Sequence, residues 1–464
     1  MTSRFVVFGA SGDLTRRYLM PALVRLHAAG RLAGDLGIVG AARDAWDTEV
    51  FRRRIGEGLA RHAADVPAQA RAELVRRLEY RRADVTDPEG VGALLGDSRT
   101  PAVVYLALPP AVAAPAVQAL GCQPLAEGTR IVLEKPFGED LASARTLNRL
   151  LRETFPESAV FRMDHFLGKQ TVQNLLGLRF GNRIFEPVWN AGHIERVEIV
   201  WDESLGLEGR AGYYDRAGAL RDLIQNHLLQ LLCLVAMEPP IGLGERDLRD
   251  RKVDLLRAVR RLSPEEVASG TRRARYTAGQ VGGRSFPAYA EEDGVDPARG
   301  TETYAEVGLQ IDNWRWKGVP FLLRTGKALA RDRRQISVHF RAVPHLVFGA
   351  TPEPVSNVLA FSLDPDRVTL RVNINGPGDP FDLEAAALDL ELAAQELPAY
   401  ARLLLAVLEG DATLSIRDDE AEESWRLVEP ILGVWQAGGV PLGEYPAGAP
   451  AAAVTAAEAP GADG

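Results

Sequence analysis

The sequence predicts an α/β protein with an N-terminal doubly wound parallel sheet and a C-terminal α+β domain that contains a large, mostly antiparallel sheet. Over the first 170 residues, short apolar runs alternate with helical patterns, which is typical of βαβ units. After Phe180, strand-like segments alternate apolar with polar residues, as half-exposed antiparallel strands do. The length of 464 residues also exceeds what one hydrophobic core usually serves, which favours at least two domains.

The N-terminal half contains the predicted parallel strands. The first is expected at 5–9, where an apolar run ends in glycine and is followed by leucine and valine at helical spacing. Further buried strands are expected at 36–42, 102–108 and 130–133, with helical patterns between them. We therefore predict a Rossmann-like, nucleotide-binding domain over residues 1–170.

The C-terminal half is predicted to be a substrate and dimerisation domain over residues 171–446. Helices are expected at 216–237 and 385–409. Beyond 446 the chain is mainly alanine, glycine and proline with scattered acids, so 447–464 is predicted to be a disordered tail. Because open sheets in soluble proteins are generally covered, we expect a homodimer or homotetramer. The main antiparallel strands are expected at 196–201, 319–324, 336–340 and 368–374.

The composition of the chain indicates which binding partners and which compartment to expect. The chain carries 54 basic and 63 acidic side chains, and this net charge of −9 argues against a nonspecific grip on nucleic acid or anionic membrane. Its two cysteines, Cys122 and Cys233, form no paired motif, which favours a reducing compartment and excludes a cysteine-built zinc site. No signal peptide is recognisable, and the longest apolar stretch, 228–237, is about half a membrane span. A soluble cytoplasmic protein is expected.

A phosphate-binding turn is predicted between the first strand and the first helix. Residues 9–14, GASGDL, place free backbone N–H groups at the positive end of a helix, although the full GxGxxG spacing is missing. The second strand ends in Arg43 where NAD-binding sheets usually carry an acid. An arginine there suits a 2′-phosphate and favours NADP over NAD. The alternative is that Arg43 is a solvated surface residue, and Asp44 directly after it weakens the NADP interpretation.

Four further segments carry a family resemblance. They are 134–138 (EKPFG), 162–169 (RMDHFLGK), 212–227 (GYYDRAGALRDLIQNH) and 313–327 (NWRWKGVPFLLRTGK). In this order, and over most of the chain, they closely resemble the glucose-6-phosphate dehydrogenase family. The resemblance implies oxidation of glucose 6-phosphate at C1 to 6-phosphoglucono-1,5-lactone with hydride transfer to NADP, the first step of the oxidative pentose phosphate pathway.

The catalytic residues follow from this resemblance and from the chemistry. Removing hydride from an alcohol carbon requires the hydroxyl proton to leave as well, and a neutral imidazole is a natural base near pH 7. The resemblance assigns the base to His227 and the carboxylate that orients its ring to Asp164. Without the motifs, a buried histidine satisfied by a core carboxylate would be the ordinary alternative.

The resemblance also implies a substrate set that contains phosphate ligands, sugar-hydroxyl ligands and a lysine shared with the cofactor. The chain has only five lysines, and three of them fall in this set, although surface lysines are normally just solvated. His165 and Lys169 are the phosphate ligands. The complete set is Lys135, His165, Lys169, Glu203, Asp222, Lys327 and Arg331.

The implied cofactor contacts lie at the ends of the first strands. Asp84 and Val85 correspond to adenine and ribose contacts, and Lys135 is expected to reach the nicotinamide side. The strand end at 105–110, YLALPP, matches the segment beside the nicotinamide ribose or is a plain strand terminator. The remaining histidines have no metal-ligand spacing, so no metal is expected. The cofactor set is Gly9, Ser11, Gly12, Asp13, Leu14, Arg43, Asp84, Val85 and Lys135.

The chain departs from the family pattern at several positions. Phe166 replaces a phosphate-binding tyrosine, Gln170 a glutamate and Tyr18 a lysine, and the end of the domain, 444–450 (EYPAGAP), lacks the usual tryptophan. These changes leave open a paralogue that acts on a related sugar 6-phosphate, such as an amino sugar.

Two other functions are alternatives for a chain with these motifs. A catalytically silent NADPH-binding regulator would be expected to have lost Asp164, His227 or Lys169, all of which are present. An oxidoreductase of the wider sugar-dehydrogenase superfamily typically lacks the DHFLGK and QNH motifs.

Overall fold

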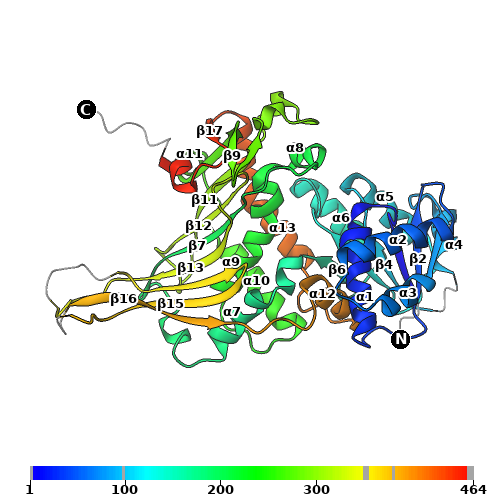
Figure 1. Ribbon diagram of the computed structural model, residues 1–464, viewed down its shortest axis with the longest axis horizontal. Helices are drawn as coiled ribbons and strands as arrows, with labels where there is room; N and C mark the ends of the chain where they lie inside the picture. The colour runs from blue at the N-terminus through cyan, green and yellow to red at the C-terminus, as the bar shows by residue number, and fades with distance from the viewer. Residues whose placement is uncertain (1–3, 97–99, 349–354, 379–381, 457–464) are drawn as a thin grey trace. The chain divides into compact units, whose positions relative to one another are not determined.

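The computed structural model describes residues 4–96, 100–348, 355–378 and 382–456, shown as the coloured ribbon in Figure 1. The chain divides into two compact units. Within the described ranges, no helix combines the length and the apolar composition needed to cross a membrane. Unit 1 comprises Met1–Lys169, Pro240–Asp250 and Gln395–Glu422, and unit 2 comprises Gln170–Pro239, Arg251–Ala394 and Glu423–Gly464.

Unit 1 contains a six-stranded parallel sheet in the order β3-β2-β1-β4-β5-β6. This confirms the predicted doubly wound sheet. The strand order reverses between β1 and β4, and ligands of such sheets bind outside the carboxyl ends of the strands at this point. The strands are β1 (Arg4–Phe8), β2 (Gly37–Ala42), β3 (Leu78–Arg82), β4 (Ala102–Leu106), β5 (Arg130–Glu134) and β6 (Val160–Met163).

Helices cover this sheet because its central strands are buried on both faces. Phe5 to Phe8 of β1, for example, are all fully buried. The helical elements are η1 (Thr15–Leu19), α1 (Met20–Ala28), α2 (Thr48–His62), α3 (Ala68–Arg76), α4 (Pro88–Leu95), α5 (Pro110–Gly121), α6 (Leu141–Thr154), η2 (Glu157–Ala159), η3 (His165–Gly168) and α12 (Ala399–Glu409).

Helix α12 belongs to unit 1, although the sequence predicts a contiguous domain over 1–170. Leu403, Leu404 and Val407 of α12 join the same apolar cluster as Leu23 and Leu26 of α1. The side chain of Arg130, in β5, also donates to the carbonyls of residues 407 and 408 at 2.9 and 2.8 Å. Burial of this apolar face explains why a late segment returns to the N-terminal sheet.

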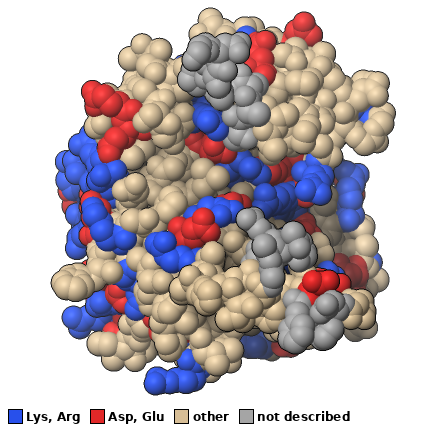
Figure 2. All heavy atoms as spheres, turned by 90° about the vertical axis from the view of Figure 1, so that its left-hand side faces the viewer, with Lys and Arg blue, Asp and Glu red and all other residues tan. Residues whose placement is uncertain are grey.

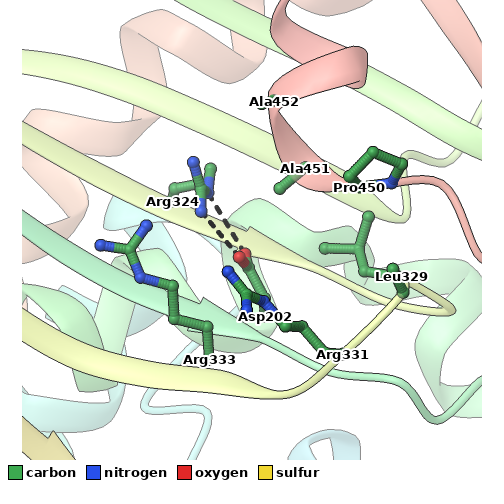
Figure 3. A pocket seen from close by; sticks show the side chains of 9 residues that line it. Asp202, Arg324, Leu329, Arg331, Arg333, Pro450, Ala451 and Ala452 are labelled. Atoms are coloured by element: carbon green, nitrogen blue, oxygen red, sulfur yellow. Dashed lines mark hydrogen bonds and ion pairs between the residues drawn. The ribbon is translucent and has the colours of Figure 1, made fainter.

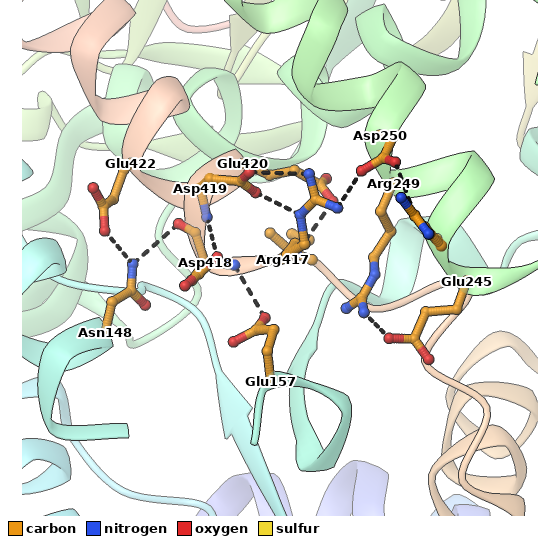
Figure 4. A network of polar contacts seen from close by, with 12 residues as sticks. Asn148, Glu157, Glu245, Arg249, Asp250, Arg417, Asp418, Asp419, Glu420 and Glu422 are labelled. Atoms are coloured by element: carbon orange, nitrogen blue, oxygen red, sulfur yellow. Dashed lines mark hydrogen bonds and ion pairs between the residues drawn. The ribbon is translucent and has the colours of Figure 1, made fainter. Parts of the chain in front are cut away.

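A polar network joins the three segments of unit 1 (Figure 4). Arg417 lies at its centre, with Nη1 2.6 Å from Asp250 Oδ1 and Nε 2.8 Å from Asp419 Oδ1. Asn148 Nδ2 donates to Glu422 Oε1 at 3.0 Å. Because these groups lie on α6, on 240–250 and on 395–422, the network holds the two later segments to the first.

Unit 2 is built on a nine-stranded sheet in the order β16-β15-β14-β13-β7-β12-β11-β8-β17. The sheet is mostly antiparallel, as predicted, but β7 pairs with β12, and β8 with β17, in parallel. Its strands are β7 (Ile194–Asp202), β8 (Thr271–Thr277), β11 (Tyr304–Gln310), β12 (Pro320–Gly326), β13 (Arg333–Phe340), β14 (Val358–Leu363), β15 (Asp366–Asn375), β16 (Leu383–Glu391) and β17 (Leu442–Pro446).

The other elements of unit 2 are helices, short turns and a small hairpin. The hairpin pairs β9 (Gly279–Val281) with β10 (Arg284–Phe286). Helical elements that lie wholly or mostly in this unit are α7 (Gln170–Phe180), η4 (Glu186–Val188), α8 (Ala211–Ala219), η5 (Leu220–Leu228), α9 (Leu229–Ala236), α10 (Glu245–Ala258), α11 (Pro264–Gly270), η6 (Tyr289–Glu291), η7 (Pro297–Arg299), α13 (Asp418–Gln436) and α14 (Ala451–Ala456).

The predicted helix at 385–409 is wrong in its first part. Residues 383–391 form β16, which pairs with β15 from Arg367↔Glu391 to Asn375↔Leu383. The segment LEAAALDLE is rich in residues that favour helices, but pairing with a long neighbouring strand overrides that preference.

The predicted disordered tail also differs from the structure over 447–456. Ala447, Ala449 and Val454 join an apolar cluster with Tyr276 and Tyr445. Backbone bonds fix the same segment, since the amide of residue 280 donates to the carbonyl of Ala447 at 3.1 Å. Small side chains allow this close approach, whereas composition alone indicates disorder. Residues 457–464 lie outside the described residues.

Candidate active site

The predicted phosphate turn follows β1 at the point where the strand order reverses. Gly9 has φ +82°, and a Cβ at this position would lie 2.2 Å from the carbonyl oxygen of Ala107. Only glycine therefore fits. Ser11 Oγ donates to Asp44 Oδ2 at 2.6 Å, and Asp13 forms ion pairs with two arginines of η1 at 3.0 and 3.1 Å. The turn is thus held by groups at its flanks.

Arg43 and Asp84 lie at the neighbouring strand ends. Arg43 follows β2 and is exposed, while Val85 is buried. The Thr86 hydroxyl donates to Asp84 Oδ1 at 2.7 Å, and this bond, together with the charge of Arg43, lowers the pKa of Asp84. An exposed guanidinium beside a turn that admits only glycine fits a phosphorylated dinucleotide.

A partly buried cluster around Glu134 connects two of the motifs. Glu134 ends β5 immediately before Lys135, and the hydroxyls of Tyr105 and Tyr400 both donate to its Oε1. The Tyr400 ring stacks on His165, with ring centroids 6.2 Å apart. The EKP motif is thereby coupled to the DHF motif through a helix that comes from a distant part of the chain.

The same cluster accounts for one departure from the family pattern. Tyr18, which replaces a lysine, stacks on Tyr400, with the two ring centroids 5.7 Å apart. The substitution therefore serves aromatic packing within unit 1.

Stability should depend on the protonation of Glu134. Burial raises the pKa of Glu134 to about 7, well above the 4.5 of a solvated glutamate. A carboxyl with a raised folded-state pKa contributes most stability below its unfolded pKa and loses it as pH rises toward the folded value. As the pH rises from about 4.5 to about 7, the unfolding free energy of the wild-type protein should therefore fall relative to that of Glu134→Gln. The expected slope is at most about 1.4 kcal/mol per pH unit.

Denaturant unfolding of both proteins across this pH range measures the difference. Glu139→Gln, at an exposed position of the following loop, serves as the control and should follow wild type. Parallel curves for wild type and Glu134→Gln would show that the carboxyl does not titrate as expected.

The DHF motif begins where β6 ends. Asp164 is 1% exposed, and its Oδ1 accepts a hydrogen bond from the amide of Phe166 at 2.9 Å. The carboxylate therefore has a fixed orientation. His165 and Lys169 are half-buried, and the edge of the Phe166 ring meets His165 with centroids 5.0 Å apart. Phe166 is itself buried, and it supplies no hydroxyl at this position.

Asp222 and His227 lie on one buried helical turn of unit 2. The predicted helix over 216–237 is broken at Gly218, which has φ +70° and ψ 172°, and continues as the π-helix η5. Asp222 is 8% exposed and His227 2%. A Cβ on Gly218 would lie 2.4 Å from Glu302 Oε1, so glycine is required at the break. Short π-helical segments are frequent at functional sites, and this one carries both predicted residues.

Glu203 and Lys327 form the second polar group of unit 2. Lys327 Nζ lies 2.6 Å from Glu203 Oε2 and 5.1 Å from the centroid of the Tyr214 ring. The hydroxyl of Tyr445 donates to the carbonyl of Lys327 at 2.7 Å. Tyr445, in the segment that lacks the usual tryptophan, therefore fixes the backbone of a predicted substrate residue.

Arg331 follows Lys327 by four residues. It lines a cavity of about 160 Å³ beside Arg333 and the ion pair between Arg324 Nη2 and Asp202 Oδ2, 2.7 Å long (Figure 3). Neither Glu203 nor Lys327 lines this cavity. The structure thus pairs Glu203 with Lys327 and places Arg331 at the lining of this cavity.

Comparisons with known proteins decide the family. A family model described as glucose-6-phosphate dehydrogenase, NAD binding domain, matches residues 6–174, and one described as glucose-6-phosphate dehydrogenase, C-terminal domain, matches residues 176–461. The chain belongs to the glucose-6-phosphate dehydrogenase family. It is accordingly an oxidoreductase, and the expectation drawn from the four motifs is confirmed.

Curated relatives of the glucose-6-phosphate dehydrogenase family match almost the whole chain. Glucose-6-phosphate 1-dehydrogenase of Treponema pallidum is 42% identical over 96% of this chain and 90% of its own length. The enzyme of the same name from Mycolicibacterium smegmatis is 43% identical over 96% of this chain and 93% of its own length.

Solved structures of the family share the fold. A glucose-6-phosphate dehydrogenase in complex with its substrate glucose-6-phosphate superposes with a TM-score of 0.87 at 32% identity, covering 97% of this chain and 95% of that one. The crystal structure of glucose-6-phosphate 1-dehydrogenase from Mycobacterium avium gives a TM-score of 0.86 at 36% identity, covering 97% and 96%.

Proposed function

We propose that this protein oxidises D-glucose 6-phosphate at C1 to 6-phosphoglucono-1,5-lactone with NADP, as the first step of the oxidative pentose phosphate pathway. The observation that carries this proposal is that a member of the glucose-6-phosphate dehydrogenase family retains, in ordered and largely buried positions, the residues its chemistry needs. Asp164, His227 and the Lys327–Glu203 pair are the central ones.

His227 is the proposed general base. It takes the proton from the C1 hydroxyl, and Asp164 orients its ring and stabilises the imidazolium that results. The bond from the Phe166 amide to Asp164 supports this role because it leaves the carboxylate few orientations. NADP, when bound, accepts the hydride that leaves C1.

The substrate is proposed to be held by local groups. On the face drawn in Figure 2, basic and acidic side chains are interspersed, and the net charge of −9 offers no overall attraction for a phosphate. His165 and Lys169 bind the phosphate, and Lys135 contacts both sugar and cofactor. The proposed sugar-hydroxyl ligands are Glu203, Asp222 and Lys327, with Arg331 as a second basic group.

The proposed cofactor contacts lie at the carboxyl edge of the parallel sheet. The turn from Gly9 to Leu14 binds the pyrophosphate, Asp84 and Val85 contact adenine and ribose, and Arg43 binds the 2′-phosphate. The exposure of Arg43 and the steric need for glycine at residue 9 support this assignment.

Loss of Arg43 should discriminate between the two nicotinamides. Arg43→Ala is expected to raise the KM for NADP at least tenfold and that for NAD much less, because only NADP carries a 2′-phosphate. Steady-state rates with each cofactor measure this. Arg53→Ala, at an exposed position of α2, is the control. Equal effects on both cofactors would exclude a 2′-phosphate role for Arg43.

A substrate panel tests the proposed reaction. NADPH absorbance should appear fastest with glucose 6-phosphate and NADP among the hexose 6-phosphates. Faster turnover of an amino-sugar 6-phosphate would replace the proposed substrate, and tight NADPH binding without any turnover would indicate the silent regulator.

We also propose a cytoplasmic homodimer or homotetramer that assembles through the sheet of unit 2. Ile374 on β15 and Leu388 and Leu390 on β16 are 46%, 61% and 54% exposed. The pairing of β15 with β16 places all three on one face. The two free cysteines, Cys122 and Cys233, support a reducing compartment.

Charge on that face should prevent assembly. Leu388→Arg together with Leu390→Arg is expected to shift the mass measured by light scattering at micromolar concentration from oligomer to monomer. Ile241→Arg, at a 94% exposed position of unit 1, is the control. A wild-type monomer, or an unchanged mass in the double variant, would count against this interface.

A further inference from the structure

Unit 2 contains a cavity of about 460 Å³ that none of the proposed sugar or cofactor residues lines. This volume is within the usual range of small-molecule sites. Arg216 of α8, Arg221 of η5, Arg273 of β8 and Arg299 of η7 converge on it, and α13 closes another wall with Trp435. Guanidinium groups from four separate elements therefore share one concave site.

The two acidic residues that line this cavity, Asp215 and Glu302, already have partners within the protein. Asp215, whose side chain is fully buried, accepts from Arg299 Nη1 at 2.8 Å. Glu302 Oε1 accepts from the amide of Leu220 at 3.0 Å, and burial raises the pKa of Glu302, which favours its neutral form. The carboxylates that line the cavity thus offset only part of its positive charge.

The other three arginines of the cavity are compensated only at longer range, since Arg221 and Arg273 interact electrostatically with Glu302. Within the described part of the chain, no carboxylate forms an ion pair with Arg216, Arg221 or Arg273. Arg273 is nevertheless held in place, because its Nε donates to the carbonyl of Val440 at 3.0 Å and its guanidinium lies over the Trp435 ring, 5.8 Å from the centroid. A solvated surface arginine would not need such support.

We propose that this cavity binds a small phosphate-bearing anion. Arginine forks suit phosphate oxygens bidentately, and a polyanion would neutralise the charge that the two acids leave. Phosphate oxygens engage Arg216, Arg221 and Arg273, which line the cavity. The site is separate from the one proposed for the phosphate of the substrate, since neither His165 nor Lys169 lines it.

Binding there should affect the sugar site, an effect that rests on the proposed function. Arg221 lies directly before Asp222 on η5, and Glu302 bonds the amide at the start of the same π-helix. Gly218 packs against that carboxylate. An anion bound by Arg221 therefore contacts η5, the element that carries Asp222 and His227. Binding of the anion is expected to change the KM for glucose 6-phosphate.

Calorimetry of pyrophosphate with the full chain, at fixed ionic strength and saturating glucose 6-phosphate, tests the site. Wild type should bind one equivalent, and Arg216→Ala should bind at least tenfold more weakly. Arg210→Ala, an exposed arginine of the preceding segment outside the cavity, should match wild type. Displacement of pyrophosphate by glucose 6-phosphate, or equal affinity in Arg216→Ala, would overturn the proposal.

The test separates this site from the proposed reaction. Binding needs no turnover, so a protein without dehydrogenase activity should still bind pyrophosphate with the same dependence on Arg216. Kinetics give a second readout, in which pyrophosphate should change the KM of wild type and leave that of Arg216→Ala nearly unchanged. The same inhibition in both proteins would place pyrophosphate at the sugar-phosphate site and refute the cavity.

Discussion

Replacement of His227 by asparagine is expected to lower kcat with glucose 6-phosphate and NADP by about three to four orders of magnitude, with little change in sugar binding. Asparagine is close to histidine in size and polarity, but it cannot take a proton near neutral pH. Hydride cannot leave C1 unless the hydroxyl proton is removed. Initial rates of NADPH formation, together with sugar affinity measured by calorimetry, separate the two effects.

His193→Asn is the matched control, because His193 is exposed in the same unit and its side chain has no proposed role. That variant should keep wild-type kcat. A His227→Asn enzyme that retained most of its rate would exclude His227 as the base.

Loss of Arg162 is expected to cause the largest change in stability, about 3 kcal/mol of unfolding free energy. The side chain of Arg162 is fully buried, with Nη1 2.6 Å from Glu157 Oε1 and Nη2 2.9 Å from Asn148 Oδ1. In Arg162→Met the apolar volume is largely kept, but Glu157 loses its cation. The partly buried glutamate and the asparagine then lack their partner.

Arg152→Met is the comparison for this effect. Arg152 also pairs with acids, at 2.6 Å to Asp418 and 3.2 Å to Glu422, but its side chain is half exposed, so its loss should cost less than about 1 kcal/mol. Denaturant unfolding measures both variants. Similar losses for the two would show that burial does not determine the contribution of these ion pairs.

The sequence predicts the central strands well and the edges poorly. A strand such as β1, buried on both faces, leaves a continuous apolar run, whereas the edge strand β3 reads LEYRR with three exposed residues. Strand β6 is short and contains the buried Arg162, a polar residue that the pattern cannot distinguish from a loop. The return of 395–422 to unit 1 depends on packing between distant segments, which local patterns do not report.

The candidate site also contains residues that the sequence identifies and residues that it does not. Motif residues such as Asp164 and His227 can be named from the sequence because their neighbours identify them. The cluster around Glu134 could not be predicted, since Tyr400 comes from a helix far along the chain. The arginines of the large cavity were also missed, because arginine is so abundant here that no single one stands out.

The most direct test of the proposed mechanism is a double-mutant cycle on kcat with His227→Asn and Asp164→Asn. If the acid acts only through the imidazole, the double variant should be no slower than His227→Asn alone, and Asp164→Asn should lose its effect once the base is gone. Losses that multiply in the double variant would show that the two side chains act independently, which would contradict the proposed pair.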